Sequence, residues 1–302
     1  LVRSGSTPCE GFRPGRHQSH RNTLTLLFMA SVPNSPSQPP RGFRCQGSVV
    51  VVTGAAGGIG AALARRCVND GATAVIVADR DAARVQILAQ EIGAHPLVCD
   101  LATEAGTREL VEATEARFGP IDLFCANAGI TAAGGVELPD EVWMRMWQIN
   151  VMAHVQAARL LVPRMLERGS GHFLVTASAA GLLSQFDAPY AVTKHAAVAF
   201  AEWLSIEYGD QGIGVSCLCP AGVDTAMFRA ESTSRQSLMS NHVLTADDVA
   251  SVAMAGLAQG QFLILPHTEV REFFETRANQ HERWLKGMRR LHTQARIAEE
   301  KN

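Results

Sequence analysis

The residues best suited to chemistry in this sequence are a tyrosine and a lysine one helical turn apart. Tyr190 and Lys194 stand at positions i and i+4, so on a helix both side chains lie on one face and can reach the same ligand. A phenol, with a pKa of about 10, is a poor base at neutral pH unless a nearby positive charge favours the phenolate. Lys194 would supply such a charge, and Ser178, twelve residues before Tyr190, can hydrogen-bond a substrate oxygen.

A Tyr-x-x-x-Lys pair is more often part of a solvated helix face, so it indicates catalysis only where the sequence also contains a ligand-binding motif. The stretch Ser48–Gly60, SVVVVTGAAGGIG, has four consecutive valines followed by a glycine-rich turn and a helical pattern. A strand, a glycine turn and a helix N-terminus together make a site for a dinucleotide pyrophosphate, because free N–H groups and the helix dipole favour negative charge. The residues expected there are Gly54, Gly57, Gly58, Ile59 and Gly60.

An acid at the end of the next apolar run strengthens the dinucleotide interpretation. Asp79 follows Gly60 by 19 residues and closes the run Ala74–Ala78, where a carboxylate can accept hydrogen bonds from the adenosine ribose. A 2′-phosphate there would meet a like charge, so the sequence predicts NAD rather than NADP. Arg80 is the counter-argument, since an arginine can pair with that phosphate.

Length and composition exclude several classes of protein. The 302 residues are 47% hydrophobic with a formal charge of −2, so we expect no nucleic-acid partner. No run approaches 18 apolar residues, which argues against a membrane span. The seven cysteines form no C-x-x-C pair, and neither they nor His154 and His172 have metal-ligand spacing, so we expect no metal site and a reducing, cytoplasmic location. His195 adjoins Lys194 but points about 100° away from it on a helix, which favours packing or exposure over catalysis.

From Gly47 onward, strand and helix patterns alternate. This alternation predicts an α/β fold: a single Rossmann-type, doubly wound parallel sheet of about seven strands with helices on both faces. The expected strands are 48–53, 73–79, 95–99, 121–126, 171–177, 213–219 and 261–265. The expected helices are 58–70, 81–92, 103–118, 141–168, 189–210 and 246–258.

Ligands in such a sheet bind beyond the carboxyl ends of the strands, so the residues at those ends are further candidates for the cofactor site. Polar or small residues recur at each of them. The candidates at or just after these ends are Asp100, Leu101, Asn127, Ala128, Gly129, Pro220, Val223 and Thr225.

Together these motifs resemble those of the short-chain dehydrogenase/reductase family over roughly 47–265. The turn Thr53–Gly60 looks like the family's cofactor turn, and 127–129 looks like its N-A-G motif. Asn150 is similar to the catalytic asparagine that helps hold a relay water beside the lysine, and Ser178, Tyr190 and Lys194 match the other catalytic positions. Ala126 and Ala221 depart from the usual asparagine and glycine, and the usual glycine-rich C-terminus is absent.

The sequence predicts an N-terminal extension followed by a single domain. Residues 1–45 are rich in Arg and Pro and poor in acids, which predicts a disordered or non-native extension, with an organellar presequence as the alternative. Residues 46–302 are expected to form one domain, with a lid near 226–244 and a helical tail over 268–297 that docks on the core or on another subunit. We expect a homo-oligomer, either a dimer or a tetramer.

The sequence therefore predicts an oxidoreductase that moves a hydride between a nicotinamide dinucleotide and a small-molecule alcohol or ketone. Leu182, Leu183 and Phe186 predict a mainly apolar substrate, and Arg229 is the nearby cation that could bind a carboxylate. The alternative is a catalytically idle dinucleotide-binding sensor or interaction protein. The four filled catalytic positions argue against that alternative.

Overall fold

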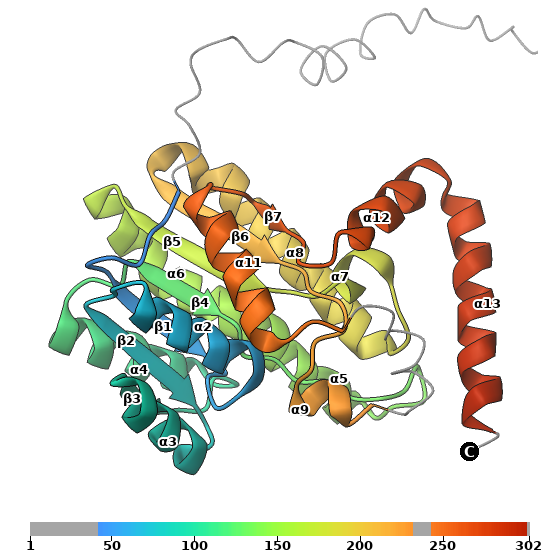
Figure 1. The fold of residues 1–302 in the computed structure, drawn as a ribbon, viewed down its shortest axis with the longest axis horizontal. Coiled ribbons are helices and arrows are strands. Elements are labelled where there is room, and N and C mark those ends of the chain that lie inside the picture. The colour runs from blue at the N-terminus through green and yellow to red at the C-terminus, as the bar shows by residue number, and fades with distance from the viewer. Residues whose placement is uncertain (1–41, 232–242, 301–302) are drawn as a thin grey trace, which may run out of the picture. The chain divides into compact units, whose positions relative to one another are not determined.

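A parallel β-sheet organises the part of the chain that the structure describes. The computed structural model describes residues 42–231 and 243–300, which fall in one of two units of the chain, 39–302. Within these residues the sheet has seven strands in the order β3-β2-β1-β4-β5-β6-β7 (Figure 1). The strands are β1 Val49–Thr53, β2 Ala74–Asp79, β3 His95–Val98, β4 Leu123–Ala126, β5 Gly171–Thr176, β6 Ile213–Leu218 and β7 Leu263–Ile264. The predicted fold class is confirmed.

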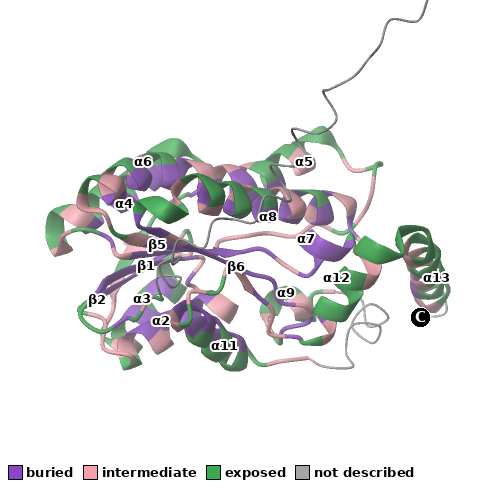
Figure 2. Cartoon of the chain, turned by 90° about the horizontal axis from the view of Figure 1, so that it is seen from above, coloured by how far each residue is buried: buried purple, intermediate pink, exposed green. Residues whose placement is uncertain are grey.

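Helices cover both faces of the sheet. On one face lie α2 (Gly58–Asn69), α3 (Ala82–Ile92) and α11 (Ala246–Ala258); on the other lie α4 (Glu104–Phe118), α6 (Ala153–Arg168) and α8 (Ala188–Tyr208). Figure 2 shows the buried strands between these two layers. The shorter helical elements are α5 Asp140–Trp147, η1 Gln148–Met152, α7 Ala180–Leu183, η2 Gly209–Gln211 and α9 Ala226–Arg229.

The valine run forms the strand at the centre of both cores. Val49 and Val51 pack into the core under α4, α6 and α8, whereas Val50 and Val52 pack into the core under α2 and α11. Because successive side chains of a strand point to opposite faces, only a strand with helices on both sides needs an unbroken apolar run. Chain order reverses between β1 and β4, and in such a sheet this is the point where ligands bind.

The helix expected over 141–168 is interrupted. Five residues, Gln148–Met152, form a π-helical segment between α5 and α6. Asn150, at its centre, is fully buried. A π-bulge is rare and often marks a functional site, and apolar periodicity carries no signal for the extra residue in the turn.

The C-terminal tail forms two helices, α12 (Glu269–Asn279) and α13 (His281–Glu299). Val270 of α12 is buried in the core, and the Arg277 guanidinium donates hydrogen bonds to the Leu182 carbonyl oxygen and to His195 Nε2, the latter at 3.0 Å. On α13, the ring of His292 stacks on Phe186 at a centroid distance of 5.3 Å. The tail therefore docks on α7, on α8 and on the loop between them.

Most of the expected N-terminal extension and part of the expected lid lie outside the described residues. Residues 1–41 of the extension are not described. Phe43 N donates to Leu257 O at 2.8 Å and Cys45 is buried, so Phe43 and Cys45, which were expected to lie in the extension, belong to the packed structure. Residues 232–242 of the expected lid are likewise outside the described part. Among the helices that the structure describes, none combines the length and the apolar character that a membrane span requires.

Candidate active site

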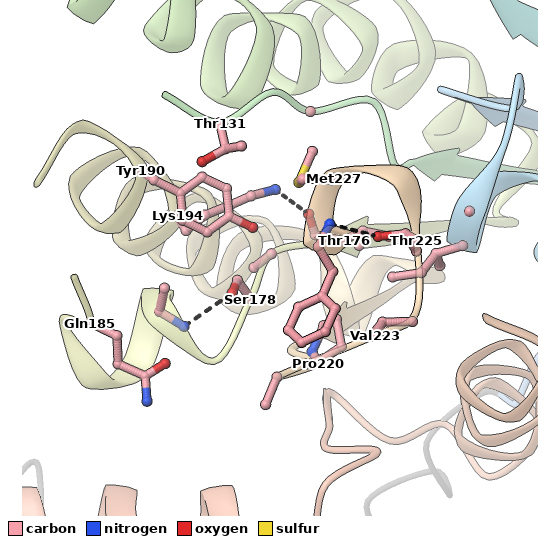
Figure 3. Close-up of a pocket in the computed structure, with 18 of the residues that line it drawn as sticks. Thr131, Thr176, Ser178, Gln185, Tyr190, Lys194, Pro220, Val223, Thr225 and Met227 are labelled. Atoms are coloured by element: carbon pink, nitrogen blue, oxygen red, sulfur yellow. Dashed lines mark hydrogen bonds between the residues drawn. The ribbon is translucent and has the colours of Figure 1, made fainter. Parts of the chain in front are cut away.

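A cavity of about 640 Å³ lies beyond the carboxyl ends of the central strands. It joins the glycine turn and Asp79 to Ser178, Tyr190 and Lys194 in one continuous space. Figure 3 shows part of its lining, with the side chains of Tyr190, Lys194 and Ser178 grouped together. Of the expected site residues, the lining includes Gly54, Gly57, Gly58, Ile59, Gly60, Asp79, Asn127, Gly129, Ser178, Tyr190, Lys194, Pro220, Val223 and Thr225.

The glycine turn leaves the N-terminus of α2 open toward this cavity. Gly57 precedes the helix with no side-chain cap, so the first N–H groups of α2 are available to a ligand. A Cβ at Gly57 would meet nothing within 4 Å, whereas one at Gly60 would lie 2.2 Å from Gly54 O. Gly58 has a φ of +54°, a region that favours glycine. The turn therefore suits a dinucleotide, because it combines close packing behind the helix with open space and free donors in front of it.

Asp79 lies at the far end of the same cavity. Its Oδ2 accepts a hydrogen bond from Ala56 N and its Oδ1 one from Asp81 N, both at 3.1 Å. These bonds fix the carboxylate against the glycine turn, where each oxygen retains a lone pair for a further donor. Arg80 is exposed and does not line the cavity.

Thr53 holds the 127–129 segment against β1. Its hydroxyl donates to Cys125 O at 3.0 Å and accepts from Asn127 N and Ala128 N at 2.9 and 3.1 Å. The Asn127 amide in turn donates to Thr53 O at 3.0 Å. Sequence reasoning assigned Thr53 only to the turn motif, and no spacing rule marks it as the hydroxyl that organises the neighbouring loop.

The tyrosine and lysine are on one face of α8, as their spacing predicts. Lys194 Nζ lies 5.8 Å from the Tyr190 ring centroid and donates to Thr176 O at 2.9 Å. Ser178 comes from the loop after β5, where its Oγ accepts from Ala180 N at 3.1 Å. Its hydroxyl is also close enough to Tyr190 to lower the pKa of the phenol. The three groups that a proton transfer to a substrate oxygen requires are thus brought together.

Burial sets the protonation of the pair. It raises the pKa of Tyr190, an effect that the hydrogen bond from Ser178 opposes and the charge of Glu231 adds to. Burial also lowers the pKa of Lys194 to about 8. In this environment Tyr190 is a neutral phenol at neutral pH and so carries a proton that it can donate.

Asn150 does not line the cavity but supports it from behind. Its Oδ1 accepts from Ile130 N at 2.9 Å, and its Nδ2 donates to Ile130 O and to Thr193 Oγ1, both at 3.0 Å. A Cβ on Gly129 would lie 3.3 Å from both Asn150 Oδ1 and Lys194 Nζ. The π-helical segment therefore joins the 127–130 loop to α8 next to the lysine.

Four of the expected cofactor residues lie outside the cavity lining. Arg80 and Asp100 are exposed, and the Asp100 Oδ1 accepts from Ala102 N at 3.0 Å, as a turn residue does. Leu101 is buried in the hydrophobic core, and Ala128 packs against that core. A strand end predicts the edge of the sheet but not which residue of the following turn faces the ligand.

The cavity also contains residues that sequence reasoning missed. Gln185 and Asp187 come from the loop before Tyr190, and Glu231 follows α9. The tail contributes Glu269, Val270, Phe273 and Leu291. The helical periodicity of the tail could be read from the sequence, but the place where the tail docks could not. Arg229, by contrast, pairs with Asp224 and does not line the cavity.

Comparison with known proteins agrees with this geometry. A family model described as short chain dehydrogenase matches residues 48–236, most of the parallel sheet and the whole Ser178–Lys194 segment. The chain belongs to the short-chain dehydrogenase/reductase family. The resemblance noted in its motifs is therefore confirmed.

This short-chain dehydrogenase/reductase is similar in sequence to known enzymes and in fold to solved structures. The 1-deoxy-11-beta-hydroxypentalenate dehydrogenase of Streptomyces avermitilis is 34% identical over 75% of this chain and 87% of its own length. A short chain dehydrogenase/reductase from Burkholderia phymatum in complex with NAD is 29% identical, with a TM-score of 0.73 over 80% of this chain and 96% of its own. The L-sorbose reductase of Gluconobacter frateurii, complexed with NADPH and L-sorbose, is 26% identical, with a TM-score of 0.66 over 74% and 97%.

Proposed function

We propose that this oxidoreductase interconverts a mainly apolar secondary alcohol and its ketone with a nicotinamide dinucleotide. The observation that carries the proposal is the grouping of Ser178, Tyr190 and Lys194 at one end of a cavity whose other end is the glycine turn. When bound, the nicotinamide supplies or accepts the hydride. The open donors of α2 and the carboxylate of Asp79 are the groups that would hold the dinucleotide.

The proton is the part of the reaction assigned to the protein. Tyr190 gives its hydroxyl proton to the carbonyl oxygen during reduction and takes it back during oxidation. Ser178 orients the same oxygen through its hydroxyl, which lines the cavity beside Tyr190. General acid–base catalysis of this kind contributes roughly 10²–10⁴-fold.

Lys194 and Asn150 have supporting roles in this proposal. Lys194 uses one donor on Thr176 O, and its remaining donors can bind the nicotinamide ribose. Its charge also favours the phenolate during alcohol oxidation. Asn150, which fixes the loop beside Lys194, completes the proton path as the family resemblance implies.

NAD is the cofactor that we propose. Asp79 supports it, because a 2′-phosphate would be repelled by the carboxylate. The related structures contain NAD in one case and NADPH in another, so the family alone favours neither. The exposed position of Arg80 leaves Asp79 as the charged group in this part of the lining.

The substrate that fits the lining is neutral and largely apolar. Leu183, Phe186, Met227, Phe228 and Val270 provide its walls. The name of the Streptomyces relative describes a carboxylate substrate. Here Lys194 is the sole lysine or arginine in the described lining, and it lies beside Tyr190, so an anionic group elsewhere in the cavity would lack a counter-charge.

Turnover of a ketone panel tests this proposal. Purified protein would be incubated with reduced NAD or NADP and neutral cyclic, bicyclic and linear ketones, and oxidation of the cofactor followed by absorbance. Reduction of apolar ketones is expected. Saturable cofactor binding without turnover of any panel member would favour the alternative, a catalytically idle sensor or interaction protein.

We also propose that the protein is a homo-oligomer, dimer or tetramer, in a reducing compartment such as the cytoplasm. Large apolar side chains are exposed on α5 and α8, among them Met144, Trp147, Trp203 and Ile206. Light scattering of the purified protein would measure the oligomeric state.

The proposal of a reducing compartment is supported by the cysteines. Six buried cysteines among the described residues are free thiols, including Cys217 and Cys219 with sulfurs 3.7 Å apart.

A further inference from the structure

The C-terminal tail provides an acidic residue to the lining of the cavity. Glu269, the first residue of α12, lines the cavity together with Val270 and Phe273. Figure 1 shows α12 beside α7, and Arg277 fixes it there through Leu182 O and His195 Nε2. Glu269 therefore stands on an anchored helix and not on a free end of the chain.

The Glu269 carboxylate is half-buried and has lone pairs to offer. It forms no hydrogen bond or ion pair with any other residue in 42–231 or 243–300. A substrate bound against this half-exposed carboxylate displaces solvent from it, so the substrate must supply a donor in place of that solvent. The neighbouring apolar residues Val270, Phe273 and Leu291 supply no such donor.

We propose that Glu269 is a specificity-determining residue that accepts a hydrogen bond from a second hydroxyl group on the substrate. This inference rests on the proposed function, since it takes the same cavity as the site of ketone reduction. The substrate class is thereby narrowed to a hydroxylated apolar ketone or the corresponding diol. A site that hydrogen-bonds a substrate hydroxyl discriminates against the analogue without it, because its polar group is then left unpaired.

The rest of the charge in the lining fits the same class of substrate. Glu231 raises the pKa of Tyr190 and so adds negative charge at the reacting end of the cavity. Asp187 is already engaged, accepting from Gly134 N at 2.8 Å through Oδ1. A hydroxyl donor is favoured over a carboxylate in these surroundings.

The test compares pairs of ketones that differ by one hydroxyl. Camphor and 2-decalone would each be assayed beside analogues that carry a hydroxyl at successive ring positions. The variants are Glu269→Ala and Glu269→Gln, with Glu272→Ala as control, because Glu272 lies in the same first turn of α12 but is exposed and outside the lining.

The wild type should prefer at least one hydroxylated analogue over its parent by about tenfold in kcat/KM. Glu269→Ala should reduce that preference to near unity while leaving the parent ketone within about twofold, and Glu269→Gln should fall between. The control should keep the full preference. The same preference in Glu269→Ala as in the wild type, or no preference in the wild type, would overturn the assignment of Glu269. Absence of all turnover by the wild type would overturn the proposed function and this inference with it.

Discussion

The ammonium nitrogen of Lys194 lies 5.8 Å from the centre of the Tyr190 ring, and burial shifts the pKa of both groups from its ordinary value. The lysine is buried with its pKa lowered to about 8, and the pKa of the tyrosine is raised. A reactive site built from a buried ammonium group costs stability, because the charged form has lost its hydration.

That cost leads to a prediction about Lys194→Met. A lysine whose pKa is lower in the folded than in the unfolded state destabilises the protein fully below about pH 8, and the penalty disappears as pH rises toward 10.5. The variant should be inactive yet unfold at higher denaturant concentration than the wild type at pH 7. The gain should shrink between pH 8 and 10. Equal stabilities at pH 7 would contradict the account.

Asp79→Ala should change the cofactor preference. The wild type is expected to use NAD more efficiently than NADP. Removal of the carboxylate should lower the ratio of kcat/KM for NAD to kcat/KM for NADP by about tenfold, which narrows or reverses the preference. Asp100→Ala is the matched control, since Asp100 follows the adjacent strand β3 but lies outside the cavity lining. An NADP preference in the unmodified protein would mean that Arg80 determines the choice.

Asn150→Leu should damage both stability and turnover. The change leaves Ile130 N, Ile130 O and Thr193 Oγ1 without the partner that Asn150 provides, so we expect a loss of about 2–4 kcal/mol in unfolding free energy. Thr193→Ser retains the hydroxyl and serves as control. Loss of turnover in Asn150→Leu at an unchanged melting temperature would show that Asn150 acts in proton transfer without supporting the loop.

Arg277→Ala should release α12 without touching the cofactor end of the cavity. We expect KM for a bulky ketone to rise by about five- to tenfold while the Kd for NAD, measured by titration calorimetry, stays within twofold. Arg271→Ala, an exposed arginine on the same helix, is the control. An equal rise in KM for both variants would argue against anchoring by Arg277.

Local sequence predicted most of the cofactor end of the site. The valines of β1, the glycine turn and Asp79 are close in sequence, and the i, i+4 spacing of Tyr190 and Lys194 alone brings them to one face of α8. The π-helical turn at Asn150 was not predictable, because its extra residue depends on packing against Ile130 and Thr193. The place of Glu269 in the cavity depends on the docking of α12 on α7, a long-range contact that periodicity does not encode.

The central claim is that the Tyr190 hydroxyl transfers the proton, and Tyr190→Phe tests it most directly. The ring is retained, so NAD should bind with a Kd within about threefold of the wild type, measured by fluorescence or calorimetry. Turnover of the best ketone from the panel should fall by at least about a hundredfold. Turnover near the wild-type value in a variant that still binds NAD would contradict the mechanism.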